Sequence, residues 1–259
     1  MWDKLLIAVL IIGLVVITRN TPLHVHSIGG LVFSYVSSPK GTPRNPNLAL
    51  AQGGAAITHS STAETPFYGP NMWRLAVPPE DSHVALSSHK KGTCGQAYSV
   101  LNPFAIPSRY WCFVGTRGQL GIALSHPGFL TNVSIDHPPH PTSLANAPRD
   151  VVFWGAVDGV ENERRYEQSA DAIQRLQSHL HLYPPSPLQE DKELIYVPLA
   201  VAFYNIHSPN LFQTFGILPE IDAFEMDFGL IVIQIVSNWG DSFTSLHHIG
   251  IYGQPAEGI

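Results

Sequence analysis

The stretch Phe228–Gly253 constrains the fold more than any other part of the chain. It opens with an apolar run rich in Ile and Val, which is typical of a strand buried on both faces. The tripeptide Asn238–Gly240 then indicates a tight turn. A second strand is expected over Leu246–Tyr252, where it would return and close a hairpin with the first. The end of the chain is therefore predicted to supply two strands of a β-sheet.

Alternating apolar and polar residues extend this β pattern through the preceding part of the chain. The alternation is clearest in Gln119–Leu124, Asn132–Asp136 and Val151–Trp154, and Pro and Gly separate these segments. A further strand is expected within Glu193–Ile206. Short alternating segments between turn residues predict an all-β fold, an antiparallel β-sandwich.

The segment 160–183 departs from the β pattern. Apolar residues recur there at helical spacing, and charged residues fill the other face. The apolar positions are Tyr166, Ala170, Ile173, Leu176 and Leu180. We expect a surface helix inserted between two strands of the sandwich. The acidic residues of LPEIDAFEMDFG, at Glu220, Asp222, Glu225 and Asp227, are expected to lie in a solvated loop.

Composition argues for one domain with an appendage and against nucleic acid as a partner. The chain has 259 residues and 44% hydrophobic content, enough for one substantial core. Its 14 Lys and Arg residues against 20 Asp and Glu give a net charge of −6. No basic stripe is present that could neutralise a phosphate backbone.

The N-terminal part of the chain predicts a membrane-anchor helix at residues 1–19. Leu5–Ile17 is apolar and uncharged, and it is flanked by Lys4 and Arg19. Its length falls short of a full bilayer crossing unless the flanking residues extend it, so a cleaved signal peptide and a buried helix remain alternatives. Residues 20–46 are expected to form a linker with at most one short strand, at Gly30–Val36. The linker has no heptad repeat.

Three further blocks precede the C-terminal stretch in a fixed order. They are Asn47–Gly54 (NLALAQGG), Trp111–Leu124 (WCFVGTRGQLGIAL) and Val133–Gly155 (VSIDHPPHPTSLANAPRDVVFWG). Together with the final stretch they resemble SUN domains, the luminal domains of nuclear-envelope proteins. The resemblance implies a jelly-roll, galactose-binding-like sandwich over residues 47–254, followed by a tail at 255–259. The motif residues that carry it are Trp111, Gly115, Gly118, Pro148, Asp150, Asn238, Trp239 and Gly240.

The resemblance also implies a function. SUN domains bind the C-terminal peptide of KASH-type membrane proteins and hold its carboxylate in a polar pocket, a form of terminal-carboxylate capture. His137 matches the pocket histidine of the family. Asn146 stands where the family has a serine, and His247 stands where it has a tyrosine. Both replacements can still donate a hydrogen bond to a carboxylate. Turn formation at Asn146 and a surface position for His137 are the structural alternatives.

The cysteines differ from the family pattern. Tyr110 and Ser245 occupy the two positions of a disulfide that the family has, so that bond is not expected here. The chain has only Cys94 and Cys112. Cys112 is expected to be a buried free thiol, and a Cys94–Cys112 bond is the alternative.

No enzyme is expected, because the chain lacks G-x-S-x-G, H-E-x-x-H, a Walker A loop and a dinucleotide fingerprint. No cofactor and no metal site are expected either. The overall prediction is a single-pass protein of the nuclear envelope or endoplasmic reticulum membrane, whose luminal domain binds a KASH-type partner. The alternatives are a membrane-tethered interaction module without KASH binding and a secreted carbohydrate-binding jelly roll, in which Tyr68, Trp73 and Trp111 would stack on sugars. The oligomeric state stays open.

Overall fold

The computed structural model describes most of the chain beyond residue 43. The described residues are 44–58, 94–103, 110–137, 144–180, 187 and 194–256, with the backbone alone at 24–28, 31–35 and 94–95. The predicted anchor at 1–19 lies outside them, and so do Tyr68 and Trp73. No helix in the described ranges is both long and apolar enough to span a bilayer.

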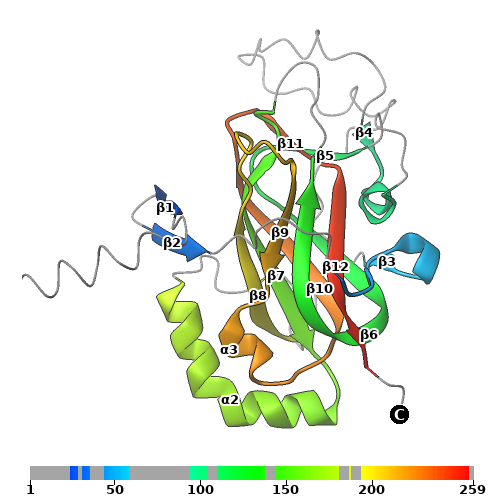
Figure 1. Ribbon diagram of the computed structural model, residues 1–259, viewed down its shortest axis with the longest axis vertical. Coiled ribbons are helices and arrows are strands. Elements are labelled where there is room, and N and C mark those ends of the chain that lie inside the picture. The colour runs from blue at the N-terminus through cyan, green and yellow to red at the C-terminus, as the bar shows by residue number, and fades with distance from the viewer. Residues whose placement is uncertain are drawn as a thin grey trace, which may run out of the picture.

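Strands make up most of the described structure, and one long helix interrupts them (Figure 1). The strands are β1 (His24–Ile28), β2 (Leu31–Tyr35), β3 (Ala56–Thr58), β4 (Cys94–Gly95), β5 (Tyr110–Val114), β6 (Gly118–Asp136), β7 (Pro148–Val157), β8 (Ile195–Phe203), β9 (Phe212–Gly216), β10 (Phe228–Asn238), β11 (Phe243–Leu246) and β12 (His248–Pro255). The helices are η1 (Ala51–Gly53), η3 (Ala97–Leu101), α2 (Val160–His179) and α3 (Pro219–Asp222).

β6 connects the two layers of the sandwich. Its first half, Gly118–Ala123, pairs with β10 on one side, and β3 pairs with part of the same half. Its second half, Gly128–Asp136, pairs with β12 and β9. The order through the main sheet is β12-β6-β10-β7-β8, and all of these pairings are antiparallel. A strand that bends from one layer into the other is a known way to close a sandwich corner. The predicted antiparallel β-sandwich is thus confirmed.

The predicted C-terminal hairpin is wrong. β10 forms as expected, but β6 lies between β10 and β12 in the sheet. β11 belongs to a different, three-stranded sheet with β5 and β4. The chain after Asn238 therefore crosses to another sheet before it returns. Local sequence predicted the strands and the turn but not their partners, because strand pairing is decided by tertiary contacts.

The first sequence block, Asn47–Gly54, packs against the end of the chain. Asn47 Oδ1 accepts hydrogen bonds from the backbone N–H groups of Ala49 and Ile251, each at 3.0 Å. Leu48 N donates to Ile251 O at 2.7 Å, and Ser125 N donates to Leu48 O at 2.9 Å. The block thus joins β12 to the bend in β6.

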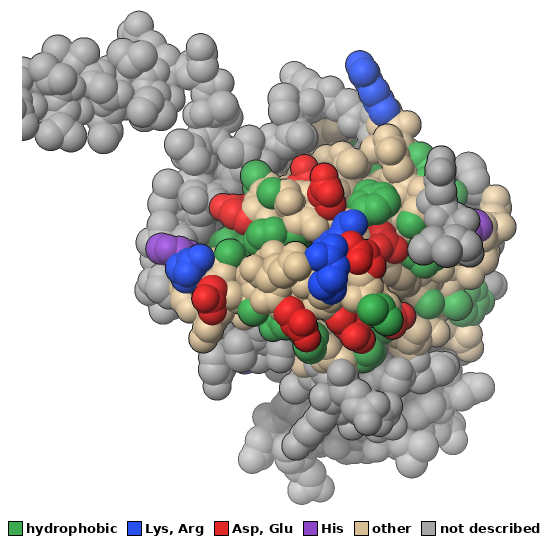
Figure 2. All heavy atoms as spheres, turned by 90° about the horizontal axis from the view of Figure 1, so that it is seen from below, with side chains coloured by type: hydrophobic (Ala, Val, Ile, Leu, Met, Phe, Trp, Pro, Cys, Tyr) green, Lys and Arg blue, Asp and Glu red, His purple; other side chains and the backbone are tan. Residues whose placement is uncertain are grey.

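The helix predicted at 160–183 is present as α2. It lies at the end of the sandwich opposite β5 and β11 (Figure 1). Ile173 is buried in the core, and Asn162 Nδ2 donates to the backbone oxygen of Asp227 at 2.8 Å. Seen from below, acidic side chains are spread over this face with basic ones between them (Figure 2). Glu220, Asp222 and Glu225 are exposed as expected, although Pro219–Asp222 forms the short helix α3 rather than a loop.

Two further observations concern the predicted linker and the motif glycines. The linker contains two strands, not one, because β1 pairs with β2. Gly115 and Gly240 both have positive φ, at 87° and 110°, which favours glycine. Gly118 packs so closely under Phe113 that an added Cβ would lie 2.6 Å from the ring.

Candidate functional site

The three predicted pocket residues come together at the β5/β11 end of the sandwich. His137 follows β6 directly, and His247 is the single residue between β11 and β12. His248 pairs with Asp136 across β12 and β6, so His247 and His137 are the next residues along the same antiparallel ladder. Asn146 is tied to β11, because Ser245 N donates to Asn146 O at 2.9 Å.

All three side chains are buried, so the alternative of a surface position for His137 is wrong. Asn146 does lie in a turn, in which Ala147 N donates to Leu144 O at 3.0 Å. The exposed fractions of the three residues are 4% for His137, 6% for Asn146 and 9% for His247. Asn146 Oδ1 has no hydrogen-bond partner among the described residues. A buried polar atom of this kind costs free energy unless water or a ligand satisfies it.

Sequence analysis missed several titratable neighbours of these residues. His248 is 5% exposed, and its Nε2 also has no hydrogen-bond partner in the described part of the chain. Burial lowers the pKa of His248 to about 4, and the neighbouring His247 adds to that effect. Burial raises the pKa of Asp136, while the charge of His247 opposes the rise. His248 is consequently neutral at physiological pH.

Tyr204, the residue directly after β8, packs beside the site. Its hydroxyl donates to Leu211 O at 2.7 Å, and His137 O lies 3.4 Å from the same hydroxyl. The rings of Tyr204 and His137 meet edge to face with centroids 6.4 Å apart. Burial, followed by the charge of Asp136, raises the pKa of Tyr204. No local pattern marks Tyr204 in the sequence, because its neighbours come from distant strands.

The motif residues build the framework around the site. Asn238 Nδ2 donates to the backbone oxygens of Asp241 and Phe243, at 3.0 and 2.9 Å, which forms the turn after β10. Asp150, two residues after Pro148, accepts from Arg149 Nε at 3.0 Å and from the hydroxyl of Ser237 on β10. The contacts of Asp150 hold the start of β7, which follows Asn146 in the chain. The contacts of Asn238 hold the turn after β10.

The expectation of a free thiol at Cys112 is wrong. Cys112 is disulfide-bonded, and no free cysteine is found in the described residues. Cys94, whose side chain lies outside the described residues, is the only other cysteine in the sequence. The backbone places Cys94 near Cys112. β4 and β5 are parallel neighbours, and Cys94 on β4 lies opposite Tyr110, two residues before Cys112.

The described tryptophans of the motifs are structural. Trp111 is 2% exposed, a core residue, and the carbohydrate-binding alternative therefore loses it as a stacking residue. Trp239 Nε1 donates to Tyr204 O at 2.9 Å. Its ring is packed by Phe203 and His207 at centroid distances of 5.5 and 5.4 Å, and Arg149 lies 5.9 Å above it.

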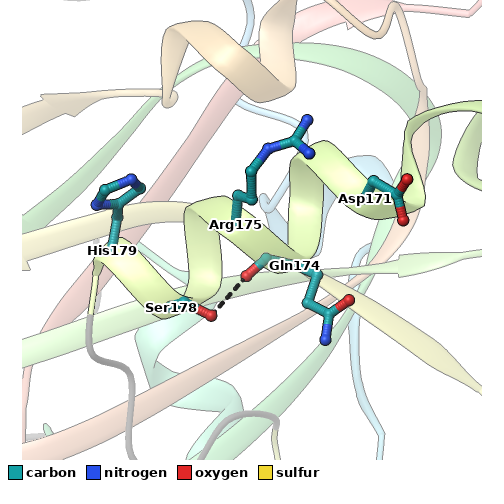
Figure 3. A pocket seen from close by; sticks show the side chains of 5 residues that line it. All are labelled: Asp171, Gln174, Arg175, Ser178 and His179. Carbon is teal, nitrogen blue, oxygen red and sulfur yellow. Dashed lines mark hydrogen bonds between the residues drawn. The ribbon is translucent and has the colours of Figure 1, made fainter.

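A separate hollow lies along α2 (Figure 3). The side chains that line it are Asp171, Gln174, Arg175, Ser178 and His179. Ser178 Oγ donates to Gln174 O at 2.9 Å within the helix. These positions share one face of a single helix, as expected for its solvated side, and they do not contribute to the strand-end site.

Known proteins resemble the chain over most of its length. It is 24% identical over 221 residues to the SUN domain-containing protein 5 of Mus musculus, covering 80% of this chain and 44% of that protein. It is 24% identical over 224 residues to the human protein of the same name, covering 82% and 44%. It is 23% identical over 250 residues to the sperm-associated antigen 4 protein of Rattus norvegicus, covering 92% and 44%. The chain thus spans less than half the length of these relatives. No family model matches it.

Solved structures align with the chain at lower sequence identity. A family 32 carbohydrate-binding module from Streptococcus pneumoniae EndoD aligns with a TM-score of 0.45 at 10% identity, covering 81% of this chain and all of the module. An allantoicase aligns with a TM-score of 0.44 at 12% identity, covering 86% and 46%.

Proposed function

We propose that this chain, which is similar to SUN domain-containing proteins over most of its length, is a non-enzymatic adaptor of the nuclear envelope or endoplasmic reticulum membrane. In this proposal the sandwich lies in the lumen and binds the C-terminal peptide of a KASH-type membrane protein. The two proteins together would bridge the inner and outer nuclear membranes. A segment at residues 1–19 would anchor the chain.

The observation that carries the proposal is the convergence of His137, Asn146 and His247. His137 and Asn146 come from the connection between β6 and β7, and His247 comes from the much later connection between β11 and β12, yet they meet at one end of the sandwich. All three are buried and polar. Buried polar side chains that converge in this way support binding of a polar ligand group rather than simple packing.

The donors and acceptors of the three side chains suit a peptide terminus. The imidazoles of His137 and His247 can each donate an N–H to a carboxylate. Asn146 can donate through its amide and accept a peptide N–H at the Oδ1 that lacks a partner in the described structure. A hydrogen bond to a charged acceptor contributes about 1.5–3 kcal/mol, so a few such bonds would select a free carboxylate over an amide.

The disulfide supports a luminal location. Disulfides persist in the endoplasmic reticulum and other oxidising compartments and are rare in the cytosol. Cys112 is bonded within the sheet that borders the site. A domain that depends on this bond would mature where the proposal places it.

The proposal is tested by titrating the full 259-residue chain, in detergent, with synthetic peptides covering the C-termini of KASH proteins. Each peptide is used with a free and with an amidated carboxyl group. We expect binding of the free acid, loss of binding on amidation, and at least about tenfold weaker binding after His247→Ala. His207→Ala, at an exposed histidine, is the matched control and should bind normally.

A different result would change the assignment. If the folded chain binds no peptide with a free carboxylate, the KASH proposal is wrong. The chain would then be a membrane-tethered interaction module with another kind of partner. Circular dichroism on the same samples establishes that the chain is folded.

A further inference from the structure

Asn132 lies in the second half of β6 and begins a triplet with Val133 and Ser134. A triplet of Asn, any residue but proline, and Ser or Thr is the acceptor pattern for N-linked oligosaccharides. It occurs once in the 259-residue sequence. A residue within a strand can carry a glycan only if the folded sheet leaves room for it, so the surroundings of Asn132 decide whether the pattern can be used.

The position of Asn132 on β6 turns its side chain away from the core. The next residue, Val133, is a fully buried core residue that pairs with Phe215 on β9 and with Ile251 on β12, both in the same core. Successive residues of a strand point to opposite faces of the sheet, so Asn132 lies on the outer face. It is half-buried there. Within the described ranges its side-chain amide makes no hydrogen bond that a glycan would have to break.

The two residues that pair with Asn132 leave open space beside it. On β9 the partner is Gly216, which is exposed, and nothing lies within 4 Å of a Cβ added there. On β12 the partner is Tyr252, whose side chain extends along its own strand over Gly250. The hydroxyl of Tyr252 lies 3.3 Å from Ser134 Oγ, so this ring leans away from Asn132. The space on the β9 side is therefore free for a bulky group.

We propose that Asn132 is a site of N-linked glycosylation, and that the oligosaccharide lies over the outer face of β6 and β9 beside Gly216. This inference rests on the luminal location that is part of the proposed function, because N-linked glycans are found on secreted and luminal domains.

The modification joins Nδ2 of Asn132 to the anomeric carbon of an oligosaccharide that is carried on a lipid diphosphate. The new C–N bond forms as the C–O bond to the diphosphate breaks. The lipid diphosphate leaves, and the amide nitrogen gives up one proton. Ser134, whose hydroxyl completes the acceptor pattern, is 0% exposed in the fold. The transfer must therefore precede the folding of β6, and the folded sandwich has only to accommodate its product.

The glycan would lie away from the proposed peptide site. His137 is five residues beyond Asn132 and follows the end of β6. At the rise of a β-strand this separates the two residues by roughly 17 Å. The outer face of β6 and β9 would thus be shielded from protein partners, whereas the end of the sandwich at His137 would stay open to a peptide.

The test is synthesis of the full-length chain in a cell-free system that contains endoplasmic reticulum microsomes. The product is compared on a denaturing gel before and after treatment with an endoglycosidase. We expect one discrete increase in apparent mass, which the endoglycosidase removes. Asn132→Gln and Ser134→Ala should each abolish it, and Ser134→Thr, which keeps the acceptor pattern, should retain it. Asn210→Gln is the control, because Asn210 is exposed and lies outside the triplet.

Protection of the chain from added protease reports its location independently of the glycan. If the chain is protected by the microsomes but gains no mass, Asn132 is not a glycosylation site, and the proposed function stands. If the increase persists in Asn132→Gln, the glycan is attached elsewhere and the inference is wrong. If the chain is not protected at all, the inference and the luminal location in the proposed function fail together.

Discussion

His248, the first residue of β12, lies directly opposite Asp136 near the end of β6. Burial moves the pKa values of the two side chains in opposite directions, down to about 4 for His248 and upward for Asp136. Each shift favours the neutral form, as expected for groups removed from water. The burial of these two groups therefore makes the stability of the domain depend on pH.

The first prediction is a loss of stability between pH 6.5 and pH 4. In this window the unfolded chain protonates His248, whose pKa is then about 6.5, while the folded chain does not. The full effect is about 3 kcal/mol of unfolding free energy, lost as the pH falls. Urea unfolding at several pH values checks it.

Asp136 has the opposite effect on stability. Its raised pKa adds stability below the pKa of the unfolded carboxyl group, and this is lost as the pH rises through the folded value. The variant His248→Gln removes the histidine and keeps Asp136, so comparing it with the unaltered chain between pH 6.5 and 4 isolates the contribution of His248. His248→Gln should flatten the profile there, whereas exposed His207→Gln should leave it unchanged. A His248→Gln variant with the original slope would contradict the prediction.

The second prediction concerns the disulfide of Cys112. Replacing Cys112 with Ser should lower the unfolding free energy by about 3 kcal/mol, the value expected for a closed loop of this size. The same loss should appear when the unaltered chain is unfolded in urea with a reducing agent. Peptide mapping without reduction should recover Cys94 and Cys112 in one linked fragment. Separate fragments would contradict the bond.

The third prediction concerns a hydrogen bond between two neighbouring strands of the main sheet. Trp154 Nε1 on β7 donates to Gln234 Oε1 on β10 at 3.1 Å, and both side chains are buried. Gln234→Met should cost about 1–3 kcal/mol, because the indole N–H is left without an acceptor. Gln254→Met, at an exposed position of β12, should have little effect. Equal stabilities in chemical unfolding would show that the bond contributes nothing.

The fourth prediction concerns Gly118. An added Cβ would lie 2.6 Å from the Phe113 ring, so Gly118→Ala should destabilise the domain by about 1–3 kcal/mol through overpacking. Gly216→Ala is the control, because nothing lies within 4 Å of a Cβ there. Its effect should stay within about 0.5 kcal/mol. Thermal unfolding of both variants separates the two cases, and similar melting temperatures would exclude the predicted clash.

Local patterns predicted the elements of the fold well. The helical spacing of Ile173 and its neighbours predicted α2, and the run at Phe228–Asn238 predicted β10. The same patterns failed for the pairing of the last strands, since β6 lies between β10 and β12. An apolar strand can pair with many partners, and only the packed core selects one.

The sequence by itself therefore determined the fold class, the inserted helix, the resemblance to SUN domains and the three candidate pocket residues. Only the tertiary structure decided that His137, Asn146 and His247 are buried at one end of the sandwich, that Tyr110 lies beside His247, and that Cys112 is bonded. The physical reason is that periodicity and turn chemistry act over a few residues. Burial, pKa and side-chain contacts at this site depend on strands that are distant in the chain.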